Sequence, residues 1–443
     1  MSVLRGETGR LELGGVDLAA IAGDPSHGTP TYVYDLDAMA GEASALHEAW
    51  DGEPHLVAYA VKANSAGPVV RTLIEARCGA DVVSAAELAL ALACGADPEA
   101  ILFSGVAKLD QELDAAIGAG TRGIAAIQAE SVEELSRIAA RARAVGRRAR
   151  VSLRINPAVE KATMGTHAHI ATGHDEAKFG IARGDLVHAV SLLTATAELE
   201  LVGMSTHVGS QFTSTRAYVE AARTLFDVTR DLLPTHGRSI RFVDTGGGFG
   251  IDYGDGCTVR PADFVRETRS LQTASGLGGL VHFVEPGRAL VAAHGVLLAS
   301  VVQHKSTPAG SLADAHQRWL MIDAGMNDLL RPALYQARHR VVAVDAGSPV
   351  RDVLFRVVGP VCESSDDFGA HELPLPPPGV VAILDTGAYG YTMASRYNGR
   401  ALPAEVFVRG GRVVSSRPRD SGSAWVADRY DFALSGLSGT ARS

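Results

Sequence analysis

Short apolar segments alternate with amphipathic ones between residues 56 and 284. The apolar segments are rich in valine, isoleucine or leucine, which is typical of parallel strands buried on both faces. Eight strands that alternate with helices predict a parallel α/β fold, and eight is the number that closes a (β/α)8 TIM barrel. An open, doubly wound sheet is the alternative. The eight segments are residues 56–61, 80–83, 101–103, 124–127, 151–155, 199–205, 240–243 and 280–284.

The amphipathic segments between these strands predict helices. Residues 131–148 carry apolar side chains on one face, begin at Ser131 with Glu134 three residues later, and end in basic residues. Such a start resembles a capping box, and cations suit the negative end of a helix dipole. Residues 84–94 and 215–233 have similar patterns.

After about Val291 the pattern changes to strands joined by turns, which predicts an all-β second domain. The N-terminal segment also has strand character and is expected to pair with this domain. We predict a stiff surface connector at residues 373–379 and a frayed tail after about Asp431. The predicted domains are residues 1–37 (N-terminal strands that join the β domain), residues 38–290 (the barrel) and residues 291–443 (the C-terminal β domain).

Composition excludes several classes of function. The formal net charge is −9 and no basic stripe spans a domain, so nucleic acid is not an expected partner. No segment has the apolar length of a signal peptide core or a membrane span. The four cysteines are scattered, which predicts free thiols in a reducing cytoplasm. His167, His169 and His174 share one segment, but their spacing matches no standard motif, so no metal site is predicted.

Polar residues and glycines follow several of the predicted strands. The active sites of such barrels lie at the carboxyl ends of the strands, so these residues are expected to converge on one mouth. They are Lys62 after the first strand, Asp81, Ser84 and Glu87 after the second, Arg154 and Asn156 after the fifth, His207 and Ser210 after the sixth, Asp244, Gly246, Gly247 and Gly248 after the seventh, and Glu285, Gly287 and Arg288 after the eighth.

Lys62 lies at the end of the first strand, in the sequence VAYAVKANS. Taken alone, it fits a lysine whose stem lies along the barrel rim while its ammonium group reaches water. The alternative is a desolvated amine with a lowered pKa, which can form a Schiff base with an aldehyde.

The other candidates also allow two interpretations each. The glycine triplet brings bare backbone N–H groups to a phosphate, or only makes a tight turn. Glu285 could keep a pyridine nitrogen protonated, or lie in water at the rim. His207 could stack on a flat ring, or be a core histidine. Cys362 fits a neutral thiol that donates a proton, or a small buried hydrophobe.

Seven motifs occur in one order: YAVKAN, HVGSQ, GGGFG, EPGR, MNDLLRPALY, GPVCES and GAYGYTMASRYN. Together they resemble the diaminopimelate decarboxylase family, which belongs to the fold-type-III pyridoxal-phosphate enzymes with the ornithine and arginine decarboxylases. The resemblance extends from about Thr29 to Arg417. One departure is Ser365, where the family pattern has glycine after CES, and this puts the local turn in doubt.

The resemblance implies an alanine-racemase-like (β/α)8 barrel, a C-terminal β-sandwich or β-barrel domain, and a homodimer with active sites at the interface. It implies pyridoxal 5'-phosphate as cofactor and a small amino acid as substrate. Lys62, Cys362 and His207 match catalytic positions, as Schiff-base lysine, proton donor and ring-stacking residue. Cofactor-binding positions match Lys62, Asp81, Arg154, His207, Ser210, Gly246, Gly247, Gly248, Glu285, Gly287, Arg288 and Tyr389. Substrate-binding positions match Arg288, Arg331, Tyr335, Glu363 and Tyr389.

The implied reaction is decarboxylation of meso-2,6-diaminopimelate to L-lysine and CO₂, the last step of bacterial lysine biosynthesis. One alternative is a decarboxylase of another basic amino acid, such as ornithine, arginine or a D-amino acid. The others are an amino-acid racemase of similar barrel fold and an inactive regulatory relative. Intact Lys62, Cys362 and the glycine loop argue against the last of these.

Overall fold

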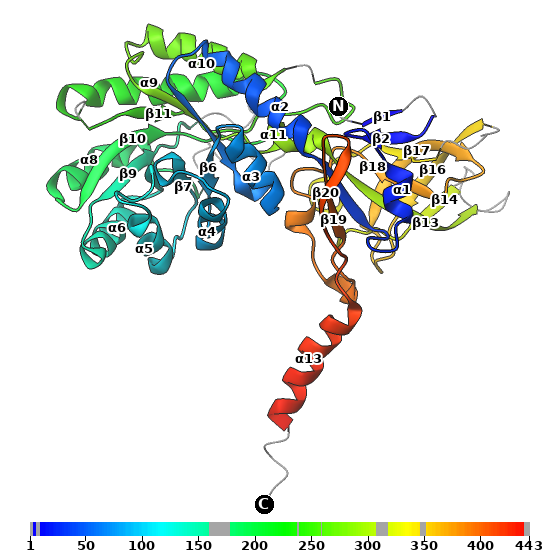
Figure 1. The fold of residues 1–443 in the computed structure, drawn as a ribbon. Helices are drawn as coiled ribbons and strands as arrows, with labels where there is room; N and C mark the ends of the chain where they lie inside the picture. The colour runs from blue at the N-terminus through cyan, green and yellow to red at the C-terminus, as the bar shows by residue number, and fades with distance from the viewer. Residues whose placement is uncertain are drawn as a thin grey trace, which may run out of the picture. The chain divides into compact units, whose positions relative to one another are not determined.

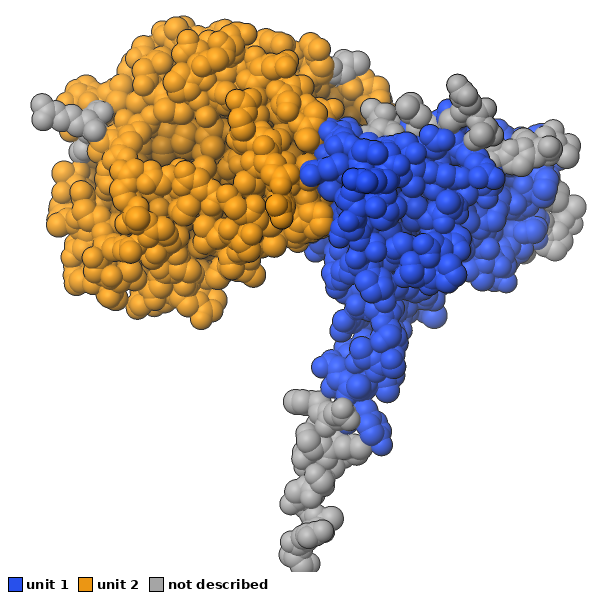
Figure 2. Space-filling view, in the orientation of Figure 1, with its two compact units in different colours: residues 1–38, 292–443 blue, residues 39–291 orange. Residues whose placement is uncertain are grey.

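The computed structural model describes residues 3–5, 9–158, 178–236, 239–257, 259–306, 318–345 and 351–437. The chain forms two compact units, which Figure 2 distinguishes by colour. One unit comprises residues 39–291, and the other comprises residues 1–38 together with residues 292–443. Each unit is described separately below.

The unit of residues 39–291 is built around a closed barrel of eight parallel strands, seen in Figure 1. The strand order is β10-β11-β12-β5-β6-β7-β8-β9. The barrel closes because β12, its last strand in the sequence, pairs with β5, its first. This confirms the predicted barrel and excludes the open sheet. The strands are β5 (His55–Ala60), β6 (Gly79–Val82), β7 (Ile101–Phe103), β8 (Ala126–Ala129), β9 (Ala149–Arg154), β10 (Leu199–Ser205), β11 (Phe242–Asp244) and β12 (Val281–Val284).

Helices follow the strands, as βα units require. In α6, Ser131 Oγ accepts a hydrogen bond from the Glu134 backbone N–H at 3.1 Å, as its capping pattern predicts. Gly146 ends this helix with a φ of 74°, two residues before the predicted end. The helices of this unit are α2 (Leu36–His47), α3 (Gly67–Glu75), α4 (Ala85–Ala93), α5 (Asp110–Gly118), α6 (Val132–Val145), α8 (Leu186–Ala195), α9 (Arg216–His236), α10 (Pro261–Ala274) and α11 (Arg288–Val291).

The second unit is a mixed β structure. Its nine-stranded sheet follows the path β17-β16-β14-β13-β4-β19-β20, with β18 pairing β13 and β15. The N-terminal strand β4 lies between β13 and β19. The strands of this sheet are β4 (Thr31–Asp35), β13 (Gly295–Ser306), β14 (Arg318–Ile322), β15 (Val341–Ala343), β16 (Arg351–Val358), β17 (Asp367–Leu375), β18 (Val380–Ile383), β19 (Ala404–Arg409) and β20 (Arg412–Arg417).

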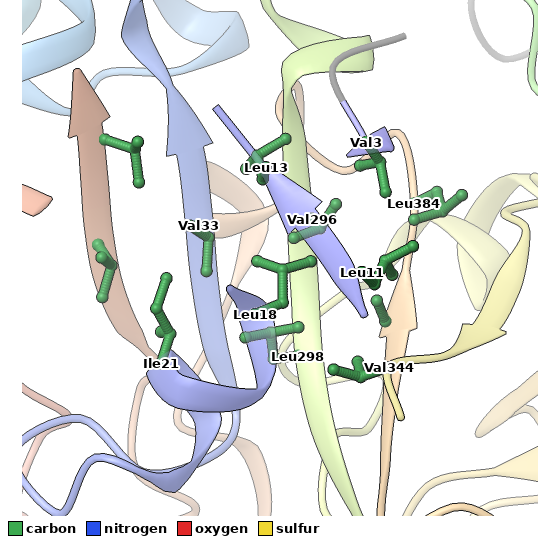
Figure 3. Close-up of a cluster of buried hydrophobic side chains, with 13 residues drawn as sticks. Val3, Leu11, Leu13, Leu18, Ile21, Val33, Val296, Leu298, Val344 and Leu384 are labelled. Carbon is green, nitrogen blue, oxygen red and sulfur yellow. The ribbon is translucent and has the colours of Figure 1, made fainter. Parts of the chain in front are cut away.

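A three-stranded sheet and a short helix cover the core of this unit, as Figure 3 shows. The small sheet contains β1 (Val3–Arg5), β2 (Leu11–Leu13) and β3 (Val16–Asp17), and the helix is α1 (Leu18–Gly23). Their apolar side chains pack against the large sheet through buried residues that include Leu13, Leu18, Val33, Val296 and Leu298.

Two predictions for this unit were wrong in part. Residues 373–375 do not belong to a connector, because they form the end of β17 and pair with β16, and only residues 376–379 connect β17 to β18. The described part of the tail is not frayed, because α13 (Gly422–Leu437) continues past Asp431 to Leu437. Among the described residues, no helix has the length and hydropathy that a membrane crossing needs.

Candidate active site

Lys62 stands in a short 3₁₀ turn, η2 (Val61–Ala63), directly after β5. Its Nζ donates a hydrogen bond to Asp81 Oδ2 at 2.5 Å. Asp81, at the third position of β6, is fully buried and also accepts a hydrogen bond from Ser104 Oγ. The Lys62 side chain is 36% exposed. The amine is therefore fixed at the carboxyl end of the barrel by a buried carboxylate, with part of its surface still accessible.

Asp244 and Glu285 form a pair of buried carboxyl groups at the same end of the barrel. Burial raises the pKa of Asp244 to about 6. Burial also raises the pKa of Glu285 well above its usual range, and the negative charges of Asp244 and Asp81 raise it further. Two carboxyl groups this close cannot both ionise easily, so the site favours a positively charged hydrogen-bond donor beside them.

Gln128, on β8, joins these two carboxyl groups. Its Nε2 donates to Asp244 Oδ2 at 2.8 Å and to Glu285 Oε1 at 2.6 Å, while its Oε1 accepts from Ser205 Oγ at 3.0 Å. Sequence reasoning missed Gln128, because a single glutamine in an apolar strand belongs to no motif. The one signal in the sequence is that Gln128 is a polar residue inside a strand that is expected to be buried.

His207 follows β10 and presents a neutral imidazole. Burial holds its pKa well below the usual value, and the charges of Arg154 and Lys62 lower the pKa further. Its Nδ1 accepts a hydrogen bond from the Gly247 N–H at 3.1 Å and lies 3.6 Å from Glu285 Oε2. Because Nδ1 accepts from a backbone amide, it carries no proton of its own.

Arg154, at the end of β9, is held by buried partners. Its Nη1 donates to Glu130 Oε1 at 2.8 Å and its Nη2 donates to the His207 carbonyl oxygen at 3.2 Å. Glu130 also accepts from the Gly180 N–H at 2.8 Å. Arg154 therefore orients the segment that carries His207, and Glu130 is a second residue that the sequence analysis missed.

The glycine triplet after β11 makes close approaches that no larger residue allows. Gly246 and Gly248 have φ values of 75° and 94°. A Cβ on Gly247 would lie 1.9 Å from the Glu285 carbonyl oxygen. The loop therefore packs directly on the segment after β12, which brings its backbone N–H groups to the barrel mouth.

The segment Glu285–Pro286–Gly287–Arg288 lies against the Lys62 turn. The Ala60 N–H donates to the Pro286 carbonyl oxygen at 3.0 Å, and a Cβ on Gly287 would lie 2.9 Å from Ala63 Cβ. Glycine at position 287 is thus required for the eighth strand to close on the first one at the residue that carries the amine.

Arg288 and Ser210 are brought together at the same mouth. Arg288 Nη2 donates to Ser210 Oγ at 3.0 Å, and its Nη1 donates to Tyr253 Oη at 2.7 Å. Arg288 and Tyr253 are both buried. A buried guanidinium and a serine hydroxyl form a donor set suited to a phosphate group. Tyr253 was not predicted from the sequence.

Three of the residues expected at the mouth have structural roles instead. Ser84 caps α4, since its Oγ accepts from the Glu87 N–H at 3.2 Å. Glu87 in turn accepts from the Val83 N–H at 2.9 Å. Asn156 Oδ1 accepts from the Ala158 N–H at 2.9 Å. These bonds fix loops around the site.

In the β unit, Cys362 and Glu363 lie in the exposed segment between β16 and β17. Asp366 closes this turn, because its carboxylate accepts from the Val361 and Met326 N–H groups, both at 2.6 Å. Ser365 Oγ donates to Glu363 Oε2 at 3.2 Å. The departure from glycine at Ser365 therefore leaves a closed turn.

The GAYGYTMASRYN motif contacts this turn. Tyr397 Oη donates a hydrogen bond to Glu363 Oε1, and the Cys362 N–H lies 3.5 Å from Asn398 Oδ1. Tyr389, from the same motif, has a φ of 55°, which is strained for a bulky residue. Strain of this kind is frequent at functional sites.

Arg331 and Tyr335 begin and end the short helix α12 (Arg331–Tyr335) of the β unit. Arg331 is buried, and its Nη1 lies 2.7 Å from His339 Nε2. His339 Nδ1 donates to the Leu384 carbonyl oxygen at 2.9 Å, so its Nε2 is free to accept from the guanidinium. Arg331 is thus held in one orientation.

His167, His169 and His174 lie outside the described residues. Within the ranges described, no group of three or more histidine, cysteine, aspartate or glutamate residues is arranged to hold a metal ion.

A barrel with an amine, a neutral imidazole, buried carboxyl groups and a phosphate-type donor set at one mouth defines a class of pyridoxal-phosphate protein. The family described as "Pyridoxal-dependent decarboxylase, pyridoxal binding domain" matches residues 37–292. The cofactor of this class is pyridoxal 5'-phosphate, and the donor set described above fits it.

Comparison with similar proteins identifies the family within this class of pyridoxal-phosphate proteins. Diaminopimelate decarboxylase of Zymomonas mobilis is 37% identical over 400 residues, covering 89% of this chain and 91% of the relative. That of Pseudomonas fluorescens is 38% identical, covering 93% and 95%. The crystal structure of the Helicobacter pylori enzyme complexed with L-lysine has a TM-score of 0.83 at 35% identity, covering 92% of this chain and 98% of that one. The chain belongs to the diaminopimelate decarboxylase family of pyridoxal-dependent decarboxylases.

Proposed function

We propose that this protein decarboxylates meso-2,6-diaminopimelate to L-lysine and CO₂, as a carboxy-lyase of amino-acid biosynthesis. The observation that carries the proposal is the grouping of Lys62, His207, Glu285 and the glycine loop at one barrel mouth. The relatives of known activity, which are 35–38% identical over about nine-tenths of the chain, support the substrate.

Pyridoxal 5'-phosphate, when bound, supplies an aldehyde for amine attachment and a ring that accepts the electron pair released with CO₂. Lys62 would attach it and Asp81 would hold the amine before attachment. His207 would lie flat against the ring, because its imidazole is neutral. Arg154 would fix the position of His207.

The phosphate group would be bound by Ser210, Arg288 and the loop of Gly246, Gly247 and Gly248, in which the Gly246 and Gly247 N–H groups donate to Asp244 Oδ1 and His207 Nδ1. Gly287 would allow the segment of residues 285–288 to pack against the Lys62 turn. Glu285 would face the pyridine nitrogen. Burial raises the pKa of its carboxyl group, and a pyridinium N–H would stabilise the ionised form.

The substrate carries an amine and a carboxylate at its far end as well as at the reacting end. We assign Arg288 and Arg331 to the distal carboxylate and Glu363 to the distal ammonium group. Tyr335 and Tyr389 would complete the substrate site. Cys362 would deliver a proton to the α-carbon after CO₂ has left.

Cys362 and Glu363 are exposed on a turn that Asp366 holds closed. We infer that the functional molecule is a homodimer, in which this turn completes the barrel site of the partner subunit. We also propose that residues 38–290 act as the cofactor-binding domain and that residues 1–37 and 291–443 act as the β domain. Four free thiols suit a cytoplasmic protein.

Product analysis tests the substrate assignment. The purified protein with pyridoxal 5'-phosphate is incubated separately with meso-diaminopimelate, ornithine, arginine and D-lysine, and CO₂ and the amine products are quantified. We expect stoichiometric CO₂ and L-lysine from diaminopimelate. Turnover of ornithine or arginine without turnover of diaminopimelate would contradict the substrate assignment. Loss of the optical activity of ornithine, arginine or D-lysine without release of CO₂ would indicate racemisation and contradict decarboxylation.

A further inference from the structure

A basic hollow lies at the amino ends of the barrel strands, opposite to the mouth that carries Lys62. Its volume is about 260 Å³. Its lining comes from the residues that precede or begin β8, β9, β10 and β11, which are neighbouring strands. The residues that matter for its charge are Arg122, Arg147, Arg148, Arg150, Arg241 and Glu200.

Two carboxylates compensate only part of this positive charge. Arg122 pairs with Glu99, with Nε to Oε1 at 2.7 Å. Arg241 pairs with Glu200, with Nη2 to Oε1 at 2.5 Å. Glu99 also lies 3.7 Å from an Arg150 Nη1, so this carboxylate is shared. Five guanidinium groups thus surround the hollow with two carboxylates among them.

The other arginines bond mainly to backbone carbonyl groups. Arg147 Nη1 donates to the Gly118 and Gly120 carbonyl oxygens, at 3.1 and 2.9 Å. Arg148 donates to the Ala197 and Leu199 carbonyl oxygens, at 2.9 and 2.7 Å. These bonds fix the guanidinium groups in place but do not neutralise their charge.

Arg150 is the buried member of the group. Its side chain is only 8% exposed, and its Nε is enclosed without a hydrogen-bond partner among the residues that the structure describes. Burial lowers the pKa of its guanidinium, against the opposing effect of Glu99. Arg150 Nη2 donates to the Gly123 carbonyl oxygen at 2.7 Å, and the carboxylate that it pairs with, Glu99, is shared with Arg122. A buried cation that is only partly compensated favours a further anion beside it.

We propose that this hollow binds a phosphoryl anion, either inorganic or carried by a nucleotide. Planar guanidinium groups match phosphate oxygens with paired hydrogen bonds, and five of them converge on a volume that suits one or two phosphoryl groups. The site is separate from the donor set at the carboxyl ends of the strands, and it does not depend on the reaction proposed above.

Calorimetric titration of the protein saturated with pyridoxal 5'-phosphate tests this site, because the cofactor fills the other phosphate position. Inorganic pyrophosphate and ADP are titrated separately at low ionic strength. Saturable binding of one anion per chain, weakening with added salt, is expected. Binding of ADP that is tighter than that of pyrophosphate identifies a nucleotide ligand, and equal or weaker binding identifies the phosphoryl group alone.

Two substitutions locate the binding. Arg241→Gln and Arg122→Gln each remove one partly exposed guanidinium and leave a carboxylate behind, so each should weaken the affinity about tenfold. Arg143→Gln is the matched control, because Arg143 pairs with Glu198 at 2.7 Å but lies outside the hollow. It should change the affinity less than twofold. The absence of saturable binding, or equal weakening by the control, would overturn the proposal.

Discussion

Gln128 shows how one uncharged residue can hold a charged site together. Its amide donates to Asp244 and to Glu285, and both of these carboxyl groups have raised pKa values because they are buried. Without a donor between them, the two groups would repel each other more strongly when both are ionised. We therefore treat Gln128 as a positioning residue for Glu285.

Gln128→Met should weaken cofactor binding about tenfold, because Glu285 loses a buried hydrogen bond and ionises less readily. The dissociation constant of pyridoxal 5'-phosphate, followed by fluorescence, measures this effect. Gln272→Met is the control. Gln272 is also buried and donates two hydrogen bonds, to the Leu277 and Leu280 carbonyl oxygens, but it lies on α10 away from the carboxyl pair. Equal weakening by both variants would mean a general loss of stability.

At the scale of elements, hydrogen bonds connect the beginning of β12 to the glycine loop. His282 Nδ1 accepts from Trp50 Nε1 at 3.3 Å, and its Nε2 lies 2.9 Å from Thr245 Oγ1. Tyr218 Oη donates to Thr245 Oγ1 at 2.8 Å. The same Oη lies 3.1 Å from the Gly246 carbonyl oxygen. A neutral His282 with its proton on Nε2 satisfies all these bonds, and protonation of Nδ1 would break the one from Trp50.

Burial lowers the pKa of His282 to about 3. In the unfolded chain this histidine takes up a proton below about pH 6.5, whereas the folded protein does not, so acid favours unfolding. Between pH 7 and pH 5 this single group should cost about 2 kcal/mol of stability. In His282→Asn the loss of stability should be smaller by about this amount, measured as the free energy of unfolding in urea at both pH values. The rest of the loss persists, because His47 and His207 also have lowered pKa values.

The exposed His304 on β13 supplies the control for this prediction. His304→Asn should keep the pH dependence of the unmodified protein. If His282→Asn keeps it as well, the buried histidine is not a source of acid sensitivity and the proton assignment along this chain of bonds is wrong.

The barrel strands could be predicted from the sequence because burial on both faces leaves a continuous apolar signal. The strand predicted at residues 124–127 begins two residues later in the structure, at Ala126. Ile124 donates to the Ala116 carbonyl oxygen in α5 and Ala125 donates to the Pro98 carbonyl oxygen in a short 3₁₀ helix, so β8 begins only at Ala126. Strand β17 was missed because it lies at the sheet edge, where Pro374 and charged side chains are tolerated and hide the apolar pattern.

The site was only partly predictable for a different reason. Lys62, His207 and the glycine triplet lie in recognisable motifs, whereas Gln128, Glu130 and Tyr253 act through partners that are distant in sequence. Gln128 meets Asp244 and Glu285 across 116 and 157 residues. Such contacts exist only after the barrel closes, and no local pattern encodes them.

At the scale of the whole molecule, the central question is whether one chain can form a complete site. Cys362 and Glu363 are exposed in the isolated chain, on a turn fixed by Asp366 and contacted by Tyr397. An exposed, hydrogen-bonded turn that carries the proposed proton donor is suited to a symmetric interface, where each subunit supplies a residue to the other.

Mixing two inactive variants tests this arrangement. Lys62→Ala and Cys362→Ala are unfolded together, refolded and assayed for lysine formation. If each site combines Lys62 of one subunit with Cys362 of the other, half of the randomly formed dimers carry one intact site, and about a quarter of the activity should return. Each variant alone, treated in the same way, is the control. No recovery in a mixture that contains mixed dimers would mean that each site belongs to a single chain.

The account depends most on the attachment of the cofactor to Lys62. The protein is loaded with pyridoxal 5'-phosphate, reduced with borohydride, digested and examined by mass spectrometry. One modified peptide is predicted, with the pyridoxyl group on Lys62, and Lys178→Ala should leave it unchanged although Lys178 is also exposed in the barrel unit. Modification of another lysine in the unmodified protein, or an undiminished yield of adduct in Lys62→Ala, would contradict the account.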